Sequence, residues 1–330
     1  MIPGTKLGIV VNPMSGRDVR RVAARASTSG HHEKQQQVTR LVLAAFAQGV
    51  SEIYLANEPF RINVRAVENL PEKDRVKILE FPLKHSAADT ESMVDQMWQH
   101  GCRVFIVLGG DGTNRIVARR YPDAIVLPLS TGTNNVFPIF VEASVAGSAA
   151  GLIAAGKLPY EDYCLRCKQV HIDYQGRTDI ALIDAVLLRD DSMGSLLPFT
   201  AEKVAGAVLT RAEPASVGIS PIGGFLHPCY HPDDFGVYVD CESGDEQNRI
   251  TVPISPGLHQ EINVTSLTTM ELDHAVLMKG PGILAFDGDR TFNLDAQEVA
   301  SLKVSRDGPW IIDPHVVLHE AATQRLLTIT

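Results

Sequence analysis

The chain has 330 residues and a mass of 35.9 kDa, a length that suggests two domains at about 150 residues each. Hydrophobic residues make up 45% and charged residues 21%, which is typical of a chain with a packed core and excludes a wholly disordered protein. The net charge of −9 argues against a surface that binds nucleic acid or an anionic membrane as a whole. It permits a local basic pocket for a phosphorylated ligand.

The N-terminus and the cysteines predict the compartment. The first residues lack the charged and apolar segments of a signal peptide, and the apolar run 141–155 is too short and too polar to span a bilayer. Five thinly spread cysteines, an odd number, are typical of the reducing cytoplasm, where we expect this protein. Cys164 and Cys167 with His171 have a second interpretation as a zinc site, although half-buried thiols in strands are commoner.

In the first half of the chain, strand and helix signals alternate. Continuous apolar runs predict strands, and apolar residues spaced three and four apart predict helices. We expect strands at 6–11, 52–55, 76–81, 104–108 and 125–128, and helices at 18–26, 33–48, 87–100 and from about Asn114 onward. This alternation is typical of an open parallel sheet with helices on both faces. It predicts an α/β nucleotide-binding domain over residues 1–157.

After residues 156–159 the sequence changes character. Short segments rich in Val, Ile and Leu are separated by Gly, Pro, Asp and Asn, and they lie at 168–174, 180–188, 236–239, 249–254 and 261–266. This pattern predicts a β-sandwich-like domain over residues 158–312. The final segment, 313–330, contains helical or mixed spacing at 316–327, and we expect it to return to the first domain.

The most informative motif follows the predicted strand 104–108 and reads Gly109-Gly110-Asp111-Gly112-Thr113. Glycines let backbone N–H groups approach a phosphate, and the helix that follows directs its N-terminal dipole at the same anion. Asp111 then has two functional interpretations, as the acceptor of a proton from an attacking hydroxyl or as a ligand of Mg²⁺ on the phosphates. The structural alternative is a turn that only reverses the chain.

Two further polar turns follow strands. The first supplies Asn12, Ser15 and Gly16, and the second supplies Thr131, Gly132, Thr133 and Asn134. Because the carboxyl ends of parallel strands meet at one edge of a sheet, we expect all three turns to cluster around one ligand. Simple capping of the next helix is the alternative for each turn.

The three turns together resemble a known superfamily. Their sequences are similar to the motifs of NAD kinases, diacylglycerol kinases and sphingosine kinases. The matching segments are Asn-Pro-x-Ser-Gly at 12–16, Gly-Gly-Asp-Gly-Thr at 109–113 and Gly-Thr-x-Asn at 132–135. Two segments resemble the acetoin-catabolism protein X group of the ATP–NAD kinase-like family in particular. They are Leu-Ser-Thr-Gly-Thr-Asn-Asn-Val-Phe-Pro at 129–138 and Gly-Arg-Asp-Val-Arg-Arg at 16–21.

This resemblance covers most of the chain and implies several properties. It implies an α/β nucleotide domain followed by a β-sandwich domain, with the active site between them. It also implies ATP and Mg²⁺ as cofactors, Asp111 as the residue that activates the acceptor hydroxyl, and a homo-oligomer. The Phe286-Asp287-Gly288-Asp289 segment resembles a strand pair of these kinases, which makes Asp287 and Asp289 candidate nucleotide or metal contacts. Their alternative is an Asp-Gly hairpin turn.

The acceptor side departs from the relatives. NAD kinases carry an Asn-Glu pair that holds NAD, and the matching positions here are Ile183 and Asp184. Ile183 cannot donate a hydrogen bond to a ribose or an amide, so Asp184 alone remains as a weak acceptor-binding candidate. The lipid kinases carry Asn-Glu two residues after their Gly-Gly-Asp-Gly-Thr motif, and this chain reads Asn114-Arg115-Ile116 after Thr113.

The sequence therefore predicts an ATP-dependent small-molecule kinase that phosphorylates a hydroxyl group. NAD is the leading but weakened acceptor, the ligands are a nucleotide and a small molecule, and neither nucleic acid nor a membrane is expected as a partner. The alternative is a nucleotide-binding regulator of acetoin-type catabolism without turnover, and a lipid kinase is the third hypothesis. Beyond these aspartates the sequence assigns no metal ligand.

Overall fold

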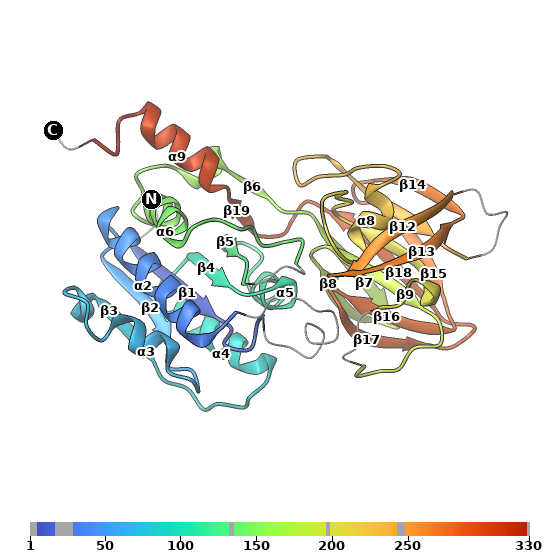
Figure 1. Cartoon of the computed structure of the whole chain (residues 1–330), viewed down its shortest axis with the longest axis horizontal. Helices are drawn as coiled ribbons and strands as arrows, with labels where there is room; N and C mark the ends of the chain where they lie inside the picture. Colours follow the sequence, from blue (N-terminus) through green and yellow to red (C-terminus); the bar gives the residue numbers. More distant parts are fainter. Residues whose placement is uncertain (1–4, 17–28, 132–134, 196–198, 243–247, 329–330) are drawn as a thin grey trace.

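The computed structural model describes residues 5–16, 29–131, 135–195, 199–242 and 248–328. It shows an α/β domain built mainly from the first half of the chain and a β-rich region built from the second half, which lie side by side (Figure 1). The predicted fold class is confirmed. The helix expected at 18–26 lies outside the described residues.

The α/β domain is centred on a seven-stranded sheet. Its order is β3-β2-β1-β4-β5-β19-β6, and neighbouring strands from β3 to β19 run parallel. The central strands are continuous apolar runs that are buried on both faces, as parallel strands under helices must be. The strands are β1 (Lys6–Val11), β2 (Glu52–Ala56), β3 (Val76–Leu79), β4 (Val104–Leu108), β5 (Ile125–Leu129), β6 (Cys164–Arg166) and β19 (Trp310–Ile312).

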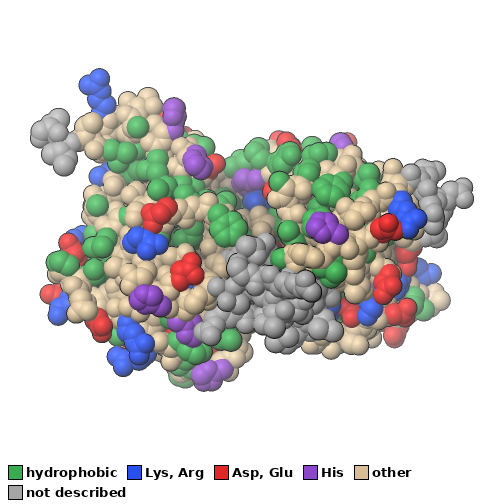
Figure 2. All heavy atoms as spheres, in the orientation of Figure 1, with side chains coloured by type: hydrophobic (Ala, Val, Ile, Leu, Met, Phe, Trp, Pro, Cys, Tyr) green, Lys and Arg blue, Asp and Glu red, His purple; other side chains and the backbone are tan. Residues whose placement is uncertain are grey.

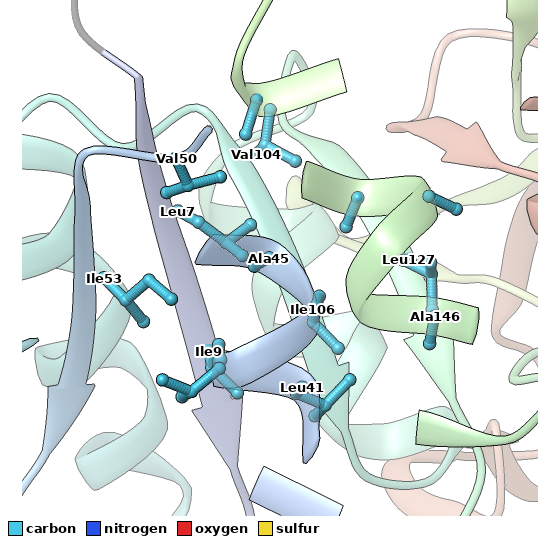
Figure 3. Packing of buried hydrophobic residues seen from close by; sticks show 14 of the residues in the cluster. Leu7, Ile9, Leu41, Ala45, Val50, Ile53, Val104, Ile106, Leu127 and Ala146 are labelled. Carbon is cyan, nitrogen blue, oxygen red and sulfur yellow. The ribbon is translucent and has the colours of Figure 1, made fainter. Parts of the chain in front are cut away.

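Helices cover both faces of this sheet. On one face, Leu41 and Ala45 of α2 lie near Leu7 and Ile9 of β1, and Ala146 of α6 lies beside Leu127 of β5 (Figure 3). On the other face lie α4 (Ala87–Gln99) and α5 (Asp111–Arg120). The first layer consists of α2 (His31–Ala47), α3 (Ile62–Val67), α6 (Ala143–Ala154) and α9 (Pro314–Thr323).

Small residues set the spacing of α2 and α6. A Cβ atom added to Gly147 would lie 2.6 Å from the backbone oxygen of Leu41, so only glycine permits this approach. The apolar run 141–155 noted in the sequence is thus a helix packed under another helix. None of the helices in the described part of the chain combines the length and the apolar character that a bilayer crossing requires.

The β-rich region has two antiparallel sheets and a hairpin. A six-stranded sheet in the order β14-β11-β10-β9-β16-β17 packs on a four-stranded sheet in the order β15-β18-β7-β8, and the hairpin β12–β13 covers the far face of the six-stranded sheet. The strands are β7 (Gln169–Tyr174), β8 (Arg177–Ala181), β9 (Asp184–Leu188), β10 (Val204–Leu209), β11 (Phe235–Asp240), β12 (Asn248–Ser255), β13 (Leu258–Val264), β14 (Ser266–Glu271), β15 (Ala275–Lys279), β16 (Gly282–Phe286), β17 (Asp289–Leu294) and β18 (Val299–Ser305). Short helices lie at α7 (Tyr160–Tyr163) and α8 (Ser220–Gly224), with single 3₁₀ turns at Lys73–Arg75 and Ala201–Lys203.

Three predicted elements differ from the structure. The strand expected at 180–188 is divided into β8 and β9, and the strand expected at 261–266 is the end of β13 and the start of β14. Helix α5 begins at Asp111, three residues before the expected Asn114. The β8–β9 break has a tertiary cause, because the carboxylate of Asp287 accepts hydrogen bonds from the N–H groups of Leu182 and Ile183, both at 2.8 Å.

The chain crosses between the two parts twice, at neighbouring positions. The sequence-based boundaries put β6 and β19 in the second domain, whereas both pair into the sheet of the α/β domain. Each of these two strands is three residues long, which is too short for a hydrophobic period to indicate which domain it belongs to. Just beyond them, Cys167 N–H donates to Pro309 O at 2.8 Å and Gly308 N–H donates to Cys167 O at 3.1 Å. Helix α9 follows β19 and packs on α6, beside the first elements of the chain (Figure 1).

Charges of both signs are mixed on the surface. On the face drawn in Figure 2, Lys and Arg side chains alternate with Asp and Glu side chains and do not gather by sign. Among the residues that the structure describes, this face shows no continuous basic patch of the kind that binds a polyanion.

Candidate functional site

A cavity of about 680 Å³ lies between the α/β domain and the β-rich region. From the α/β domain it is lined by the residues that follow β1 and β4 and by the segments after β2 and β3, so it opens at the carboxyl ends of the parallel strands. This edge is where open α/β sheets bind ligands. The β-rich region closes the opposite side with residues from β9, β12 and the β16–β17 turn.

The three polar turns predicted from the sequence meet at this edge. Asn12 Nδ2 donates to Thr113 Oγ1 at 2.9 Å, which joins the first turn to the second. Thr131 Oγ1 donates to Ser15 Oγ at 2.9 Å, which joins the third turn to the first. Gly132, Thr133 and Asn134 lie outside the described residues.

One glycine is required by the close approach of these turns, and a second lies against a flexible side chain. Gly16 has φ = +74°, and a Cβ atom there would lie 2.6 Å from Thr131 O. A Cβ atom on Gly110 would lie 2.7 Å from Asn135 Oδ1. Gly109 is crowded by the side chain of Thr113, whereas Gly112 has its nearest neighbour, Asp289 Oδ2, at an ordinary contact distance of 3.7 Å.

Asp111 is the first residue of α5 and lines the cavity. Its carboxylate accepts hydrogen bonds from Phe137 N–H at 3.0 Å and from Val136 N–H at 3.2 Å, so the segment after the third turn fixes its orientation. Burial, with the nearby charge of Asp287 as a second cause, raises the pKa of Asp111 to about 7. A carboxyl group with such a pKa can take up a proton near neutral pH.

Two more carboxyl groups from the β-rich region line the same cavity. Asp287 sits in the left-handed conformation with φ = +48°, and its carboxylate accepts from the N–H groups of Leu182, Ile183 and Asp184. The side chain of Asp184 is buried, and its Oδ1 has no hydrogen-bond partner in the described structure. Burial, followed by the charges of Asp287 and Asp111, raises the pKa of Asp184 well above its ordinary value. Burial also raises the pKa of Asp287.

Asp289 differs from these three carboxyl groups because its side chain is 56% exposed. One of its oxygens lies 3.7 Å from Arg115 Nη1. The Phe-Asp-Gly-Asp segment is thus a hairpin turn between β16 and β17, as the alternative interpretation predicted, and it also borders the cavity. The role of Asp287 and Asp289 as nucleotide or metal contacts stays a prediction.

Lys34 is a site residue that the sequence analysis missed. Its side chain is fully buried, and Nζ donates to Asn12 O at 2.8 Å, Pro13 O at 2.9 Å and Ser15 O at 2.5 Å. The signal was present, since Lys34 occupies the same face of α2 as Val38 and Leu41 and is the one charged residue among these apolar positions. It holds the backbone of the first turn in place from behind.

Arg115, also missed, connects the two parts of the molecule. From α5 its buried guanidinium donates to Asp179 Oδ2 at 2.7 Å and to Ile180 O at 2.7 Å in β8. Nη1 reaches Phe286 O at 3.4 Å, just before Asp287. Arg115 lies two residues beyond the Gly-Gly-Asp-Gly-Thr motif, but no sequence signal predicts a partner 64 residues away.

The β-rich wall of the cavity also contains apolar residues and a serine. Phe199, Val217, Ile219 and Ile254 line it, and Ser255 follows Ile254 at the end of β12. Ser255 is 1% exposed, and its Oγ has no hydrogen-bond partner in the described structure. Sequence reasoning did not identify this residue, because a serine at the end of a strand usually indicates a turn.

No protein-only metal site exists among the described residues. No three His, Cys, Asp or Glu side chains there are placed to hold a metal ion. Cys164 and Cys167 are buried free thiols whose pKa values burial raises to about 12, which disfavours the thiolate that zinc requires. The alternative interpretation of these cysteines as a zinc site is therefore not supported.

Comparison with known proteins agrees with the motifs. The sequence profile of the ATP-NAD kinase N-terminal domain matches residues 7–158, and that of the Acetoin catabolism protein X C-terminal domain matches residues 168–307. The chain is 31% identical over 299 residues to the Acetoin catabolism protein X of Cupriavidus necator, a match that covers 86% of this chain and 83% of that protein.

A solved kinase structure shares the fold. A yeast NADH kinase complexed with NADH has a TM-score of 0.56 at 11% identity, with coverage of 99% of this chain and 89% of that chain. A putative diacylglycerol kinase from Bacillus anthracis str. Sterne has a TM-score of 0.42 at 12% identity, with coverage of 96% and 100%. The resemblance inferred from the sequence is confirmed by the two profiles and the curated relative. The chain belongs to the ATP–NAD kinase-like family, in the group of the acetoin catabolism protein X.

Proposed function

We propose that this kinase-like protein is an ATP-dependent phosphotransferase that acts on the hydroxyl group of a small molecule. The observation that carries the proposal is the position of Asp111, which lies where the turns converge and borders a cavity shared by both parts of the molecule. The family relationship supports a nucleotide as the phosphoryl donor.

The turns fit a triphosphate. Gly110, Asp111 and Gly112 at the N-terminus of α5 line the cavity, so the helix presents the positive end of its dipole there. Lys34 adds a buried positive charge behind the first turn. These features together favour an anionic group at the α/β wall of the cavity.

The reaction follows from this placement. The hydroxyl oxygen of the acceptor attacks the γ-phosphorus of ATP, the bond from the γ-phosphorus to the β,γ-bridging oxygen breaks, and ADP leaves. The hydroxyl proton passes to a carboxylate oxygen of Asp111, which its backbone hydrogen bonds hold in place. Mg²⁺ would neutralise the phosphate charge, held mainly by phosphate oxygens, and Asp287 and Asp289 are the carboxylates at the β16–β17 turn that would contribute to it.

NAD is the leading acceptor within this proposal, although the structure weakens it. Ile183 replaces the asparagine of NAD kinases, its side chain is fully buried, and its N–H group is occupied by Asp287. We also propose a homo-oligomer, as the family resemblance implies. From the cysteine content and the net charge of −9 we further propose a cytoplasmic protein that binds neither nucleic acid nor a membrane.

The test compares the wild-type protein with Asp111→Asn. Purified protein with ATP, Mg²⁺ and a panel of hydroxyl acceptors that includes NAD is assayed for ADP release and for the phosphorylated product. We expect Asp111→Asn to lower the rate by about 10²- to 10⁴-fold, because the general base is lost. ATP binding, measured by the shift in melting temperature that ATP produces, should change little.

The matched control is Asp74→Asn, a similar change at an exposed position in the 3₁₀ turn Lys73–Arg75, and it should keep the wild-type rate. If the Asp111→Asn variant turns over at the wild-type rate, Asp111 is not the base. If the wild-type protein binds ATP and phosphorylates none of the acceptors, the regulator hypothesis replaces the kinase.

A further inference from the structure

Arg211 is a buried arginine that the proposed reaction does not use. It lies two residues beyond the end of β10, and its side chain is 9% exposed. Among the described residues, the one carboxylate in an ion pair with it is that of Glu213, with Oε1 4.0 Å from Nη1. Its hydrogen-bond acceptor there is Val136 O, 3.5 Å from the same nitrogen. Because a guanidinium has five N–H donors, Arg211 is weakly paired for a buried cation, and its burial costs free energy.

The backbone of Arg211 is held in place by its own part of the molecule. The next residue, Ala212, exchanges two N–H···O bonds with Cys229, at 2.8 and 2.9 Å. Ser220 Oγ donates to Arg211 O at 2.9 Å. These bonds fix the point from which the side chain leaves the β-rich region.

The side chain of Arg211 reaches the segment that holds Asp111. Its Cζ lies 5.0 Å from the centre of the Phe137 ring, within the range of a cation–π contact, and Nη1 meets Val136 O. The N–H groups of Val136 and Phe137 donate to the Asp111 carboxylate at 3.2 and 3.0 Å. Two consecutive residues therefore lie between the cation and the carboxylate, and they contact both.

The charges around Asp111 are of both signs. Burial first, and then the charge of Asp287, raise the pKa of Asp111, whereas the charge of Arg211 lowers it. Asp111 and Asp184 also oppose each other's ionisation. Arg115, on the same helix as Asp111, is paired with Asp179 and acts on Asp287, whose pKa its charge lowers. Arg211 is thus a cation from the β-rich region that favours the ionised form of Asp111.

The titratable groups around Arg211 leave its charge in place. Two are thiols whose pKa values burial raises, and one is an imidazole whose pKa burial lowers to about 3, so all three are neutral near pH 7. The other two are a carboxyl group and an ammonium group, which have opposite charges. These five residues are Cys167, Cys229, His231, Glu213 and Lys168.

We propose that Arg211 is a positioning residue for Asp111, which holds residues 136–137 against the Asp111 carboxylate and favours its ionised form. The inference deepens the proposed function and rests on it for the role of Asp111 as a base. The effect of Arg211 on the ionisation of Asp111 does not require turnover. Because Arg211 belongs to the β-rich region and residues 136–137 belong to the α/β domain, contact between the two parts then controls how readily Asp111 accepts a proton.

The test measures the ionisation of Asp111 directly. The full-length protein is labelled with ¹³C in its aspartate carboxyl groups, and the Asp111 signal is identified by its loss in Asp111→Asn. In the wild type this signal should titrate near pH 7, the pKa of Asp111 being about 7. In Arg211→Met it should titrate at a higher pH, because the positive charge is lost. Arg211→Lys, which keeps the charge, should restore most of the wild-type behaviour.

The pH dependence of turnover adds a readout that a purely structural role would not move. At about pH 6 the rate of Arg211→Met should be roughly 3- to 10-fold below that of the wild type, because less of the base is ionised. At about pH 9 the two rates should converge, since the base is ionised in both proteins. The control Arg249→Met removes an arginine that is 64% exposed in β12, and it should leave both the titration and the rate unchanged.

The outcomes separate this inference from the proposed function. An unchanged Asp111 titration in folded Arg211→Met overturns the inference, and so does an Arg211→Lys variant that titrates as Arg211→Met does. If Arg211→Met does not fold, Arg211→Gln removes the charge and gives the same comparison. A higher Asp111 titration in a protein that transfers no phosphoryl group supports the inference and contradicts the proposed function. Equal loss of rate at every pH with an unchanged titration limits Arg211 to a structural role and overturns the inference.

Discussion

Asp184 is a buried carboxyl group with two other carboxyl groups acting on it. Burial first, and then the charges of Asp287 and Asp111, disfavour its ionised form and raise its pKa. The protein retains this arrangement although Oδ1 has no partner in the described structure. Such groups are typical of functional sites, where stability is lower than the sequence could achieve.

The raised pKa of Asp184 has a consequence for stability. At a pH below its value in the unfolded chain, Asp184 is protonated in both states and has no effect. As the pH rises, the unfolded chain releases its proton first while the folded protein retains it, so stability falls until the pH passes the folded-state pKa.

We predict that Asp184→Asn weakens this pH dependence. Between pH 5 and pH 8, roughly the window above the ordinary aspartate pKa, the free energy of unfolding should fall more in the wild type than in the variant. Urea denaturation at several pH values measures this fall in the free energy of unfolding. The control Asp74→Asn should show the same pH dependence as the wild type. Parallel curves for the wild type and Asp184→Asn would show that Asp184 is ionised normally.

At the residue scale, the sequence predicted the motif residues and missed those that hold them. Asp111 and Asp287 stand beside glycines in recognisable motifs. Ser255 and Lys34 carry no motif, and their importance depends on burial, which arises only when distant segments pack. A lysine in a helix usually lies in water, and a buried one is detectable only from the apolar character of its neighbours.

Helix α2 and the first turn form one structural unit. Lys34, in the first turn of α2, donates hydrogen bonds to three backbone oxygens of residues 12–15. Because the C=O and N–H of a peptide point in opposite directions, holding the carbonyl oxygens fixes the direction of the N–H groups too. The position of the helix thereby determines the shape of the turn.

We predict that Lys34→Met destabilises this unit and weakens nucleotide binding. The variant should lose about 1.5–3 kcal/mol of stability, the value of a hydrogen-bonded charged group, and its affinity for ATP with Mg²⁺ should fall at temperatures where it is fully folded. Chemical denaturation and isothermal calorimetry measure the two effects. Lys73→Met, at an exposed position, is the control. A variant that is destabilised and yet binds ATP as the wild type does would limit Lys34 to a structural role.

At the element scale, the sequence predicted long elements better than short ones. The strands at β1, β4 and β5 follow from continuous apolar runs, and α4 follows from its apolar spacing and from Ser86, which caps it. The division of 180–188 into β8 and β9 was not predictable, because Leu182 and Ile183 are as apolar as a strand and only Asp287, about a hundred residues away, interrupts the pairing.

Across the whole molecule, Arg115 connects the α/β domain to both sheets of the β-rich region. Its guanidinium contacts Asp179 and Ile180 of β8 in the four-stranded sheet and Phe286 of β16 in the six-stranded sheet. The side chains of Arg115 and Asp179 are 8% and 9% exposed, so the ion pair is shielded from water.

We predict that Arg115→Met lowers stability by about 3–5 kcal/mol, because it leaves the buried carboxylate of Asp179 without its main partner. The double variant Arg115→Met/Asp179→Asn should be less destabilised than the sum of the two single variants, since it also removes the unpaired charge. Denaturation of the wild type, the two single variants and the double variant completes this double-mutant cycle. Additive effects, within about 0.5 kcal/mol, would mean that the pair does not couple the two parts.

The two crossings of the chain between its parts, at Cys167 and at Gly308–Pro309, are hydrogen-bonded to each other. Two adjacent tethers define a single axis of rotation. Torsion changes confined to these few residues would swing the β-rich region as a rigid body and alter the width of the cavity without breaking the pairing of any strand in either sheet. The α5 contacts of Arg115 lie away from these tethers along the chain and resist that swing. Besides the ion pair of Arg115 with Asp179, such a swing would have to separate Leu182 and Ile183 of the β-rich region from Val117 and Phe137, with which they share a buried cluster. Ligand access to the cavity therefore depends on the tethers and also on the contacts that hold its two walls together.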